Sequence, residues 1–520
     1  EHMMPVMKQH TGVTLHDLLE GLVDDSSLSP LADIVVDGVT QDSRDIGDNY
    51  VFVAVRGTAS HGLSFAEQAV RSGASVILWD AADSEQIKKA DACSNDIICM
   101  QVEDLQQKTG EVASRFFNHP SHDLNLIGVT GTDGKTSVSH YLAQCMDSKS
   151  SPCGVLGTLG NGLIHELKPT GLTTAGAVHV QQSLAMLVDE GAWAAVMEVS
   201  SHGLDQGRVN SVEFNTAVFT NLSQDHLDYH KTMESYAEAK SKLFEIAGLK
   251  SAVINLDDAF GRILAQKYRK HLTVYGYSTS SDDGSFASCA DFVVYAKSIK
   301  ATQHGFEINV VTPKGAGYFE LNLLGEFNVS NALAVLATLL LNNMAFDESI
   351  KCLSALRPVA GRMELVVVNN KPTVIVDYAH TPQGMAAACN AVKQHFSGEL
   401  WCVFGCGGDR DREKRPLMAQ AAERYADHII VTSDNPRHED PQQIIEQVVG
   451  GLAEPELAGT CIDRREAIAQ AISTAAAGDV ILIAGKGHES CQIVGDTYIA
   501  FDDCDVARVL LEQTGAGVNE

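Results

Sequence analysis

The segment from Gly128 to Thr136, with the sequence GVTGTDGKT, has the residue types of a phosphate-binding loop. It follows the apolar run from Asn125 to Ile127 and leads into a helix-like segment that ends near Met146. The N–H groups of the glycines and of the first turn of the helix can bind phosphate oxygens. Lys135 can neutralise charge on the β- and γ-phosphates, and the hydroxyl of Thr136 can bind Mg²⁺. The pattern therefore predicts a nucleoside triphosphate site, with an ordinary lysine-containing turn as the alternative.

Further polar groups follow predicted strands close to this loop in the fold. Glu198 ends one apolar run, Asp225 and His226 follow the next, and Lys240 lies on the helix after them. The carboxyl ends of parallel strands meet at one edge of a sheet, so we expect these groups beside the loop. Mg²⁺ prefers oxygen ligands and substrate phosphates, which suits Thr136 and Glu198. Taken singly, each group has an ordinary alternative, such as a capping carboxylate for Glu198 or a solvated helix lysine for Lys240.

The last third of the chain carries three polar loops, each directly after a predicted strand. They are Gly405 to Arg412, Asp434 to Arg437 and Gly485 to Glu489. Planar guanidinium groups bind carboxylates through two hydrogen bonds, and a carboxylate such as Glu489 binds an amine. Arg437 and Glu489 together would recognise a zwitterionic amino acid. A solvated charged loop and an Asn-Pro turn are the alternatives.

The alternation of strands and helices over 520 residues predicts an α/β protein of three domains. Residues 1–103 are expected to form a small N-terminal α/β domain and residues 104–355 a central P-loop-type mononucleotide-binding sheet. Residues 356–520 are expected to form a C-terminal Rossmann-like sheet. A helix is predicted from Asp104 to Phe117 and another from Val329. Strands of the C-terminal domain are predicted at Leu400 to Phe404, His428 to Thr432 and Val480 to Ala484.

The composition argues against nucleic acid and membranes as partners. The net charge of -29 argues against a nucleic-acid-binding surface, because the phosphates would be repelled. The run from Ala332 to Leu341 is too short to span a membrane, and Glu1 to Met4 lack the regions of a signal peptide. The 12 cysteines contain no C-x-x-C pair, which favours reduced thiols. We therefore expect a soluble, cytoplasmic protein, active as a monomer on small molecules.

In the order of its motifs the chain resembles the Mur ligases, the ATP-dependent amide-forming enzymes of bacterial peptidoglycan precursor synthesis, over essentially its whole length. The shared motifs are Thr130 to Thr136, Met197 to His202, Asp225-His226 and Asn328 to Asn331. Further markers are similar to the branch that adds meso-2,6-diaminopimelate to UDP-N-acetylmuramoyl-L-alanyl-D-glutamate. These markers are Thr173-Thr174, Gln206 to Arg208, Tyr236 to Lys240, Gly407 to Arg410, Asp434 to Arg437 and Gly485 to Glu489.

The resemblance implies a role for each group of residues. The ATP site would comprise Gly131, Thr132, Asp133, Gly134, Lys135, Thr136, Ser137, Asn328, Asn331, Arg362, Asp377 and His380. The UDP-muramyl dipeptide would be held by Ser43, within Asp42-Ser43-Arg44, by the loop after Gly57, and by Thr173, Thr174, Ser200, Gln206 and Arg208. The incoming amino acid would contact Arg410, Asp434, Asn435, Pro436, Arg437, Gly485 and Glu489.

The resemblance also implies the catalytic groups Lys135, Lys240, His226 and Glu198. Lys240 matches a lysine that is carbamylated by CO₂. The carbamate would be an oxygen ligand that helps His226 hold a second Mg²⁺, beside the first ion at Thr136 and Glu198. ATP would phosphorylate the D-glutamyl γ-carboxylate, and the amine would attack the acyl phosphate after the third domain closes over the second.

Arg437 favours diaminopimelate over L-lysine, because only the former has a second carboxylate for the guanidinium. The same reaction with L-lysine, a folate-type glutamate ligation and an ATP-hydrolysing nucleotide switch without ligation remain alternatives at this point.

The chain departs from the strict phosphate-loop pattern at one position and from the family pattern at several others. Val129 stands where the strict phosphate-loop pattern has glycine, and Asp133 stands where relatives often have asparagine. Leu172 precedes Thr173 where asparagine is frequent, and Thr58 to Ser60 differ from a common histidine-containing loop.

Overall fold

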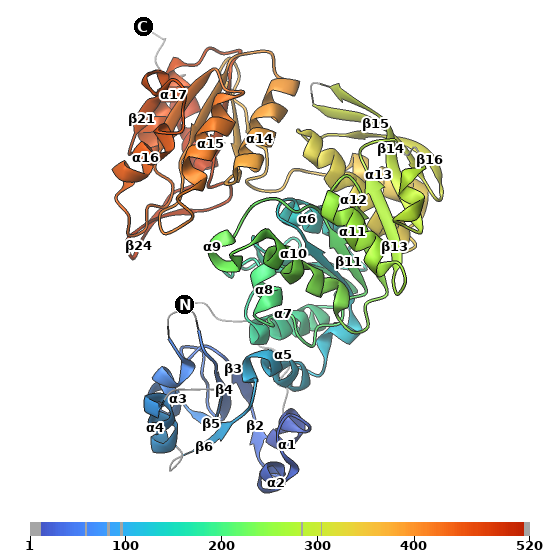
Figure 1. Cartoon of the computed structure of the whole chain (residues 1–520), viewed down its shortest axis with the longest axis vertical. Helices are drawn as coiled ribbons and strands as arrows, with labels where there is room; N and C mark the ends of the chain where they lie inside the picture. Colours follow the sequence, from blue (N-terminus) through green and yellow to red (C-terminus); the bar gives the residue numbers. More distant parts are fainter. Residues whose placement is uncertain are drawn as a thin grey trace.

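The computed structural model describes residues 12–57, 60–80, 84–93, 97–281, 284–302 and 304–513. Three main sheets follow one another along the chain, and helices cover them (Figure 1). In that view the N-terminal sheet lies below α5 and α7, and the C-terminal sheet lies beyond the central sheet at the other end. The α/β class predicted from the sequence is confirmed.

The N-terminal part is a parallel sheet of four strands in the order β3-β4-β5-β6. Its strands are short apolar runs that bury one face against helices, as in the cluster of Leu15, Val51 and Phe116. Helix α5 begins and ends within one residue of the predicted bounds, Asp104 and Phe117, and packs against α7 of the central part. The elements are β1 (Val13–Thr14), α1 (Leu15–Leu19), α2 (Asp25–Leu28), β2 (Val35–Val36), β3 (Gly38–Thr40), β4 (Tyr50–Ala54), α3 (Ala66–Arg71), β5 (Ala74–Trp79), α4 (Ser84–Cys93), β6 (Ile98–Gln101) and α5 (Leu105–Phe116).

The central sheet has ten strands in the order β16-β15-β14-β13-β12-β11-β7-β10-β8-β9. It is parallel from β14 to β8, while β9, β15 and β16 pair antiparallel. Both faces of the parallel part are buried, which explains its nearly continuous apolar strands. The elements are β7 (Asn125–Thr130), α6 (Lys135–Met146), β8 (Cys153–Gly157), β9 (Gly160–Leu163), α7 (Ala177–Asp189), β10 (Ala194–Glu198), α8 (Ser201–Asp205), β11 (Thr216–Phe219), α9 (Leu227–His230), α10 (Met233–Ser241), β12 (Ser251–Asn255), α11 (Ala259–Tyr268), β13 (Thr273–Ser278), β14 (Phe292–Thr302), β15 (Gly305–Thr312), β16 (Gly315–Leu321), α12 (Glu326–Leu341) and α13 (Phe346–Ser354).

One predicted boundary in this part was wrong. Helix α12 begins at Glu326 rather than at Val329. Gly325, with a φ of 87°, turns the chain into the helix three residues earlier than the apolar pattern indicates.

The C-terminal sheet has the order β17-β18-β22-β19-β20-β21 and is parallel except for β17. The predicted strands at 400–404, 428–432 and 480–484 coincide with β19, β20 and β22 at both ends. A separate hairpin, β23–β24, follows the sheet. The elements are β17 (Glu364–Val366), β18 (Thr373–Asp377), α14 (Pro382–His395), β19 (Leu400–Phe404), α15 (Lys414–Glu423), β20 (His428–Thr432), α16 (Pro441–Val449), β21 (Gly459–Cys461), α17 (Arg464–Thr474), β22 (Val480–Ala484), β23 (Cys491–Val494), β24 (Thr497–Ala500) and α18 (Asp503–Gln513).

The C-terminal domain rests on the central one through His395 at the end of α14. Its ring accepts a hydrogen bond from Gly325 N at Nε2 (3.2 Å), so Nδ1 must carry the proton that binds the Thr302 carbonyl (2.9 Å). Leu324 and Phe327 of the central domain pack into the hydrophobic core of the C-terminal sheet. The two domains therefore share apolar and polar contacts at one corner.

The ends of β20 and β22 are joined by a buried ion pair. Arg464 and Asp503 both have side chains that are 0% exposed, and their closest atoms are 2.8 Å apart. Arg464 also donates to the carbonyls of Ser433 (3.3 Å) and Ala484 (3.0 Å), which directly precede two of the polar loops. The pair thus fixes the strand ends from which these loops start.

Replacing Arg464 with methionine is expected to lower the free energy of unfolding by about 3–5 kcal/mol, because Asp503 would remain buried without a counter-charge. Urea unfolding of the full chain measures this change. The exposed pair of Arg508 and Asp505, 3.2 Å apart, provides the control, and Arg508→Met is expected to cost less than about 1 kcal/mol. Equal effects of the two substitutions would contradict this account.

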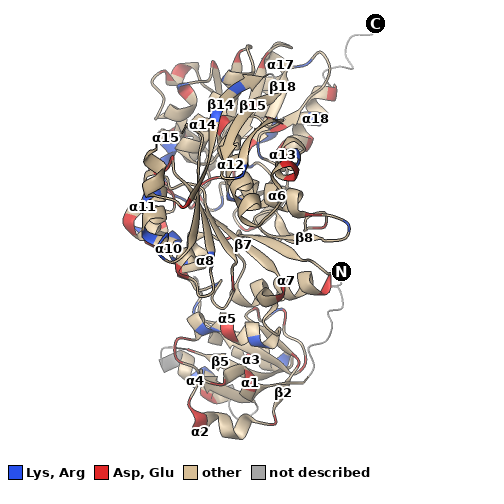
Figure 2. Cartoon of the chain, turned by 90° about the vertical axis from the view of Figure 1, so that its right-hand side faces the viewer, with Lys and Arg blue, Asp and Glu red and all other residues tan. Residues whose placement is uncertain are grey.

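None of the helices within the described ranges combines the length and the apolar character that crossing a bilayer requires. Acidic side chains occur over all three parts of the chain (Figure 2).

Candidate active site between the central and C-terminal domains

The phosphate loop connects β7 to the first turn of α6. Gly131 has a φ of 150°, and a Cβ atom there would lie 1.8 Å from Thr220 Oγ1. Gly134 has a φ of 84° and precedes the helix without a side chain that caps it. The N–H groups at the start of α6 are therefore directed out of the loop, as anion binding requires.

Two lysines converge on one backbone oxygen of this loop. Lys135 Nζ donates to the carbonyls of Gly131 (2.9 Å) and Thr132 (2.8 Å), and Lys240 Nζ donates to the same Gly131 oxygen (2.7 Å). Lys240 is only 1% exposed and lies over the ring of Tyr236. Burial lowers the pKa of both amines, and the charge of Lys135 lowers the pKa of Lys240 further. Lys240 is thus a buried amine biased toward its neutral form, not the solvated lysine of the alternative interpretation.

Glu198 ends β10 and is fully buried beside the loop. Its carboxylate accepts hydrogen bonds from Thr136 Oγ1 (2.9 Å) and from both N (2.9 Å) and Oγ1 (2.9 Å) of Thr158. Gly157 is needed here, since a Cβ atom would lie 2.2 Å from Glu198 Oε1. The sequence analysis missed Thr158, although its place directly after β8 is the strand-end signal that identified Glu198.

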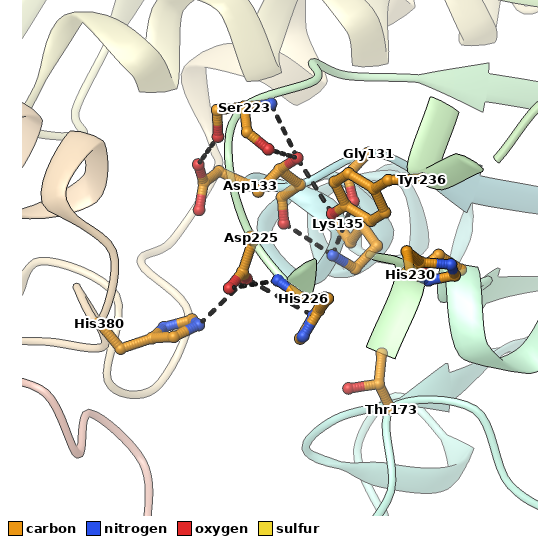
Figure 3. A network of polar contacts seen from close by, with 12 residues as sticks. Gly131, Asp133, Lys135, Thr173, Ser223, Asp225, His226, His230, Tyr236 and His380 are labelled. Carbon is orange, nitrogen blue, oxygen red and sulfur yellow. Dashed lines mark hydrogen bonds and ion pairs between the residues drawn. The ribbon is translucent and has the colours of Figure 1, made fainter. Parts of the chain in front are cut away.

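Asp225 links the two domains (Figure 3). Its carboxylate lies 3.5 Å from His226 Nε2, 3.8 Å from His380 Nε2 and 3.3 Å from Lys414 Nζ. Burial would raise the pKa of Asp225, but these three neighbours hold it below the ordinary value. Burial lowers the pKa of His226 to about 4, so the imidazole is neutral and can ligate a metal ion. His380 and Lys414 belong to the C-terminal domain, so this carboxylate connects the domains.

A cavity of about 310 Å³ lies between these groups. It is lined by the phosphate loop, by the first turns of α12 and by the segment after the domain boundary. Of the predicted ATP residues, those in the lining are Thr132, Asp133, Gly134, Lys135, Thr136, Ser137, Asn331, Arg362, Asp377 and His380, joined by Glu198, His226 and Thr173. Asn328 is not in the lining but accepts hydrogen bonds from Tyr141 and Asn331 behind it.

Asp133, a departure from the family pattern, lines the cavity and is also tied to the loop after β11. Its Oδ2 accepts a hydrogen bond from Ser223 Oγ (3.5 Å), while its backbone N–H and C=O bind Asn221 Oδ1 and Thr220 Oγ1. The loop after β11 therefore contacts both the backbone and the carboxylate of Asp133. Of the other departures, Leu172 is 48% exposed, and Thr58 and Ala59 lie outside the described residues.

Oxygen atoms dominate the groups that could hold a metal ion. Within the described ranges, no set of three His, Cys, Asp or Glu side chains is clustered in a way that would bind one. Thr136 Oγ1, the Glu198 carboxylate and the His226 ring nevertheless line one cavity. Mg²⁺ commonly takes only one or two protein ligands together with phosphate oxygens and water, and this donor set suits that mode.

Four of the predicted UDP-muramyl dipeptide residues form one hydrogen-bonded unit. Thr174 Oγ1 donates to the Glu198 carbonyl (2.9 Å) and accepts from Ser200 N (2.9 Å). Arg208 binds the Thr174 carbonyl (2.7 Å) and the Gln206 side chain (2.7 Å). The unit is thus anchored to the strand end that carries Glu198.

Ser43 is not part of that unit, because it lies in the N-terminal domain. It sits between Asp42 and Arg44, which form an ion pair with each other. The neighbouring Gln41 approaches the N–H of Val178 at the start of α7 (3.5 Å). The loop that contains Ser43 therefore faces the central domain across the domain boundary.

The predicted amino-acid residues form a separate cluster in the C-terminal domain. Arg437 Nη1 donates to the Gly408 carbonyl (2.8 Å), and Asn435 Nδ2 donates to Glu489 Oε2 (2.7 Å). Gly485 stands against Asp434, where a Cβ atom would lie 2.7 Å from the carboxylate. Arg410 is exposed nearby, and burial together with the charge of Arg410 lowers the pKa of Arg437. No described residue of this cluster lines the 310 Å³ cavity.

Aromatic contacts connect this cluster to the cavity. The Arg362 guanidinium lies 4.4 Å from the centre of the Tyr378 ring, and that ring lies 5.1 Å from the ring of His488. Arg362 Nη2 also donates to Thr136 Oγ1 (3.3 Å). Tyr378 was not predicted as a site residue, because no local pattern gives a signal for it. A continuous set of contacts thus leads from the phosphate loop to the loop of Glu489.

Three family models match the chain in consecutive segments. The Mur ligase family catalytic domain matches residues 35–116, the Mur ligase middle domain matches residues 129–339, and the glutamate ligase domain of Mur ligases matches residues 361–487.

Named relatives match over nearly the full length. The UDP-N-acetylmuramoyl-L-alanyl-D-glutamate–2,6-diaminopimelate ligase of Coxiella burnetii is 42% identical over 95% of this chain and 99% of its own length. A solved structure of a ligase with the same name has 35% identity and a TM-score of 0.66, covering 97% of this chain and 99% of its own. The MurF ligase of Thermotoga maritima, solved with ADP, shares the fold at 17% identity and a TM-score of 0.62, over 91% of this chain and 97% of its own.

Proposed function

The chain belongs to the Mur ligase family of ATP-dependent amide-forming enzymes, and we propose that it joins meso-2,6-diaminopimelate to UDP-N-acetylmuramoyl-L-alanyl-D-glutamate. The observation that carries the proposal is the pairing of a phosphate-loop cavity with a neighbouring loop cluster that presents Arg437 and Glu489. The names of the relatives support the same substrates.

The reaction has two steps. An oxygen of the D-glutamyl γ-carboxylate attacks the γ-phosphorus of ATP, giving an acyl phosphate and ADP. The neutral amine of diaminopimelate then attacks the acyl carbon, the carbon–oxygen bond to phosphate breaks, and the amine loses its proton as the amide forms. Lys135, the first turn of α6 and Arg362 would bind and orient the phosphates, so the protein acts mainly by alignment and charge stabilisation.

Magnesium is the cofactor that this site suits. We assign Thr136 and Glu198 to a first ion, and His226 and a carbamylated Lys240 to a second. When bound, Mg²⁺ would offset the negative charge of the phosphates during transfer. Thr136 Oγ1 accepts one hydrogen bond, from Arg362, and the Glu198 carboxylate accepts three, so each group keeps one lone pair for an ion.

Carbamylation of Lys240 would resolve a charge conflict in the loop. A charged Lys240 would place a second ammonium group on the Gly131 oxygen, where it would repel Lys135. Among the described residues no carboxylate is hydrogen-bonded to Lys240. A neutral Lys240 amine adds to CO₂ and releases a proton, so the cation becomes an anionic oxygen donor. Its lowered pKa favours the neutral amine that this addition needs.

The amino-acid cluster is proposed to hold both ends of diaminopimelate. Both hydrogen bonds to Glu489 from the described residues end on Oε2, so Oε1 is left for an ammonium group. Burial would raise the pKa of Glu489, but Lys486 and Asn435 hold it below the ordinary value, so the carboxylate stays charged. The Arg437 guanidinium uses Nη1 for a backbone carbonyl and keeps its other edge for a carboxylate. Arg410, Asp434, Pro436 and Gly485 would complete the site.

We assign the substrate sites to three domains, residues 1–103, 104–355 and 356–520, with some sites shared between two of them. Ser43 of the first domain and Thr173, Thr174, Ser200, Gln206 and Arg208 of the second would hold the nucleotide sugar. The amino-acid cluster lies outside the cavity, so the C-terminal domain must close further to bring the amine to the acyl phosphate. One chain carries all three sites, so we propose a monomer that works in the bacterial cytoplasm, where ATP is available.

Phosphate release from ATP tests the proposal directly. It is measured with the UDP-muramyl dipeptide present and with meso-diaminopimelate, L-lysine or no amino acid, followed by mass spectrometry of the product. Release that depends on diaminopimelate, with the matching tripeptide, is expected. Release with L-lysine alone would overturn the assignment of Arg437, and release without any amino acid or nucleotide sugar would overturn the ligase.

A further inference from the structure

Lys486 is a buried cation beside the amino-acid cluster, and the reaction scheme above gives it no role. Its side chain is 0% exposed. Its Nζ donates to Asn435 Oδ1 (3.0 Å), Glu489 Oε2 (2.9 Å) and the Cys491 carbonyl (2.7 Å). An ammonium group has three N–H donors, and all three are used. Lys486 therefore has no donor left for a substrate and acts only on its protein partners.

The three partners belong to different segments of the site. Asn435 lies in the loop that carries Arg437, Glu489 lies in the loop after β22, and Cys491 opens the hairpin β23–β24. Asn435 binds Glu489 as well, through Nδ2 (2.7 Å). Lys486 is thus the point where the two substrate-binding loops and the hairpin are held together.

The hairpin in turn holds Arg437. Arg437 N donates to the Ile493 carbonyl (3.0 Å), and Gly495 N donates to the Arg437 carbonyl (2.7 Å). Gln492 Nε2 donates to the Asp434 carbonyl at the start of the same loop (2.7 Å). Arg437 has a φ of 50°, a left-handed conformation that an arginine adopts only when its surroundings impose it.

We propose that Lys486 and the hairpin β23–β24 set the distance between the Glu489 carboxylate and the Arg437 guanidinium, and so determine which amino acid the site accepts. This inference rests on the proposed function. A substrate with an ammonium group at one end and a carboxylate at the other fits only when both protein groups are held at the matching separation. Lys486 and Gln492 are positioning residues, since they act through Asn435, Glu489 and Arg437.

A merely structural role predicts a different outcome from a positioning role. Loss of a structural contact would lower stability or affect all substrates alike. If the Glu489 carboxylate and the Arg437 guanidinium were no longer held at the matching distance, KM for the amino acid would rise and discrimination between diaminopimelate and L-lysine would fall. The KM values for ATP and the nucleotide sugar, which bind elsewhere, would be unaffected.

The test is steady-state kinetics of Lys486→Met in the full chain, with each of the three substrates varied in turn. KM for diaminopimelate is expected to rise about 10–100-fold. KM for ATP and for the UDP-muramyl dipeptide should stay within about twofold of wild type. The ratio of kcat/KM for diaminopimelate to that for L-lysine should fall. An unchanged KM for diaminopimelate, or an equal rise for all three substrates, would overturn the inference.

Gln492→Met provides a milder second variant, in case Lys486→Met does not fold. It removes one hydrogen bond to the Asp434 carbonyl and should raise KM for diaminopimelate about 3–10-fold, again without changing KM for ATP. The matched control is Lys267→Met, which breaks the ion pair of an exposed lysine with Glu245 (2.9 Å) in the central domain. A folded Gln492→Met enzyme with wild-type kinetics, or a control with the same defect, would contradict the inference.

Wild-type enzyme separates this inference from the proposed function. If wild type releases no phosphate in response to diaminopimelate, the proposed function fails. If wild type is active and both variants match it, only the role of Lys486 and the hairpin fails.

Discussion

Lys240→Ala is expected to lower the rate of amide formation by at least about 100-fold. The lysine is buried against the Gly131 carbonyl, and its carbamate is proposed to supply an oxygen ligand for Mg²⁺ next to His226. Without it the phosphates lose part of the positive charge that stabilises their transfer. The measurement is diaminopimelate-dependent phosphate release at saturating substrates.

Rescue distinguishes a carbamate from an ammonium group. Formate or acetate is expected to restore part of the activity of Lys240→Ala, because a small carboxylate can occupy the space of the carbamate. Wild-type enzyme should lose activity in CO₂-free buffer and regain it with bicarbonate. The control is Lys242→Ala. Lys242 lies two residues after Lys240, is exposed, and forms an ion pair with Asp205 (2.8 Å). Full activity of Lys240→Ala would remove this residue from the site.

Lys135→Met is expected to lower kcat/KM for ATP by about 10²–10³-fold. Lys135 lies in the cavity between the phosphate loop and Glu198, and its ammonium group is the cation of the loop itself. Burial lowers the pKa of Lys135, so its ammonium group is destabilised in the free protein. The negative charge of a bound triphosphate would stabilise it.

The measurement is phosphate release over a range of ATP concentrations, together with binding of diaminopimelate by calorimetry. Amino-acid binding should be retained, because the amino-acid cluster lies in another domain. A change in kcat/KM for ATP of less than about tenfold would contradict the assignment of Lys135 to the phosphates.

Local sequence patterns predicted the elements around the phosphate loop well. The predicted helix end near Met146 agrees with α6, and three C-terminal strands agree at both ends. These segments combine a clear apolar run with a glycine or polar residue at each end, so the local signal is complete. The start of α12 was placed three residues late because Gly325 provides a turn that apolar periodicity does not reveal.

Some elements and contacts were not predicted. The antiparallel edge strands β15 and β16 and the separate hairpin β23–β24 pair with near neighbours in the chain, but no motif or clear apolar alternation marked them. The residues Thr158, Tyr378 and Lys486 owe their positions to contacts across loops. The sequence placed Glu489 correctly as a carboxylate after a strand, but nothing in it showed that Lys486 shares one of its oxygens. Motif spacing identifies individual groups, whereas their mutual distances come from the packed fold.

The two central-domain side chains inside the C-terminal core bear on the construction of hybrid ligases. Suppose residues 356–520 of a relative with another amino-acid preference replaced those of this chain. The substrate loops and the hairpin would be transferred as one unit, but the new domain would have to pack against Leu324 and Phe327 of the host. Their shapes were fitted to the host's own α14, and a poor fit costs about 1–3 kcal/mol. The unit to transfer is therefore the C-terminal sheet together with side chains at positions 324 and 327 that match it. A hybrid joined at the linker without this match would be less stable.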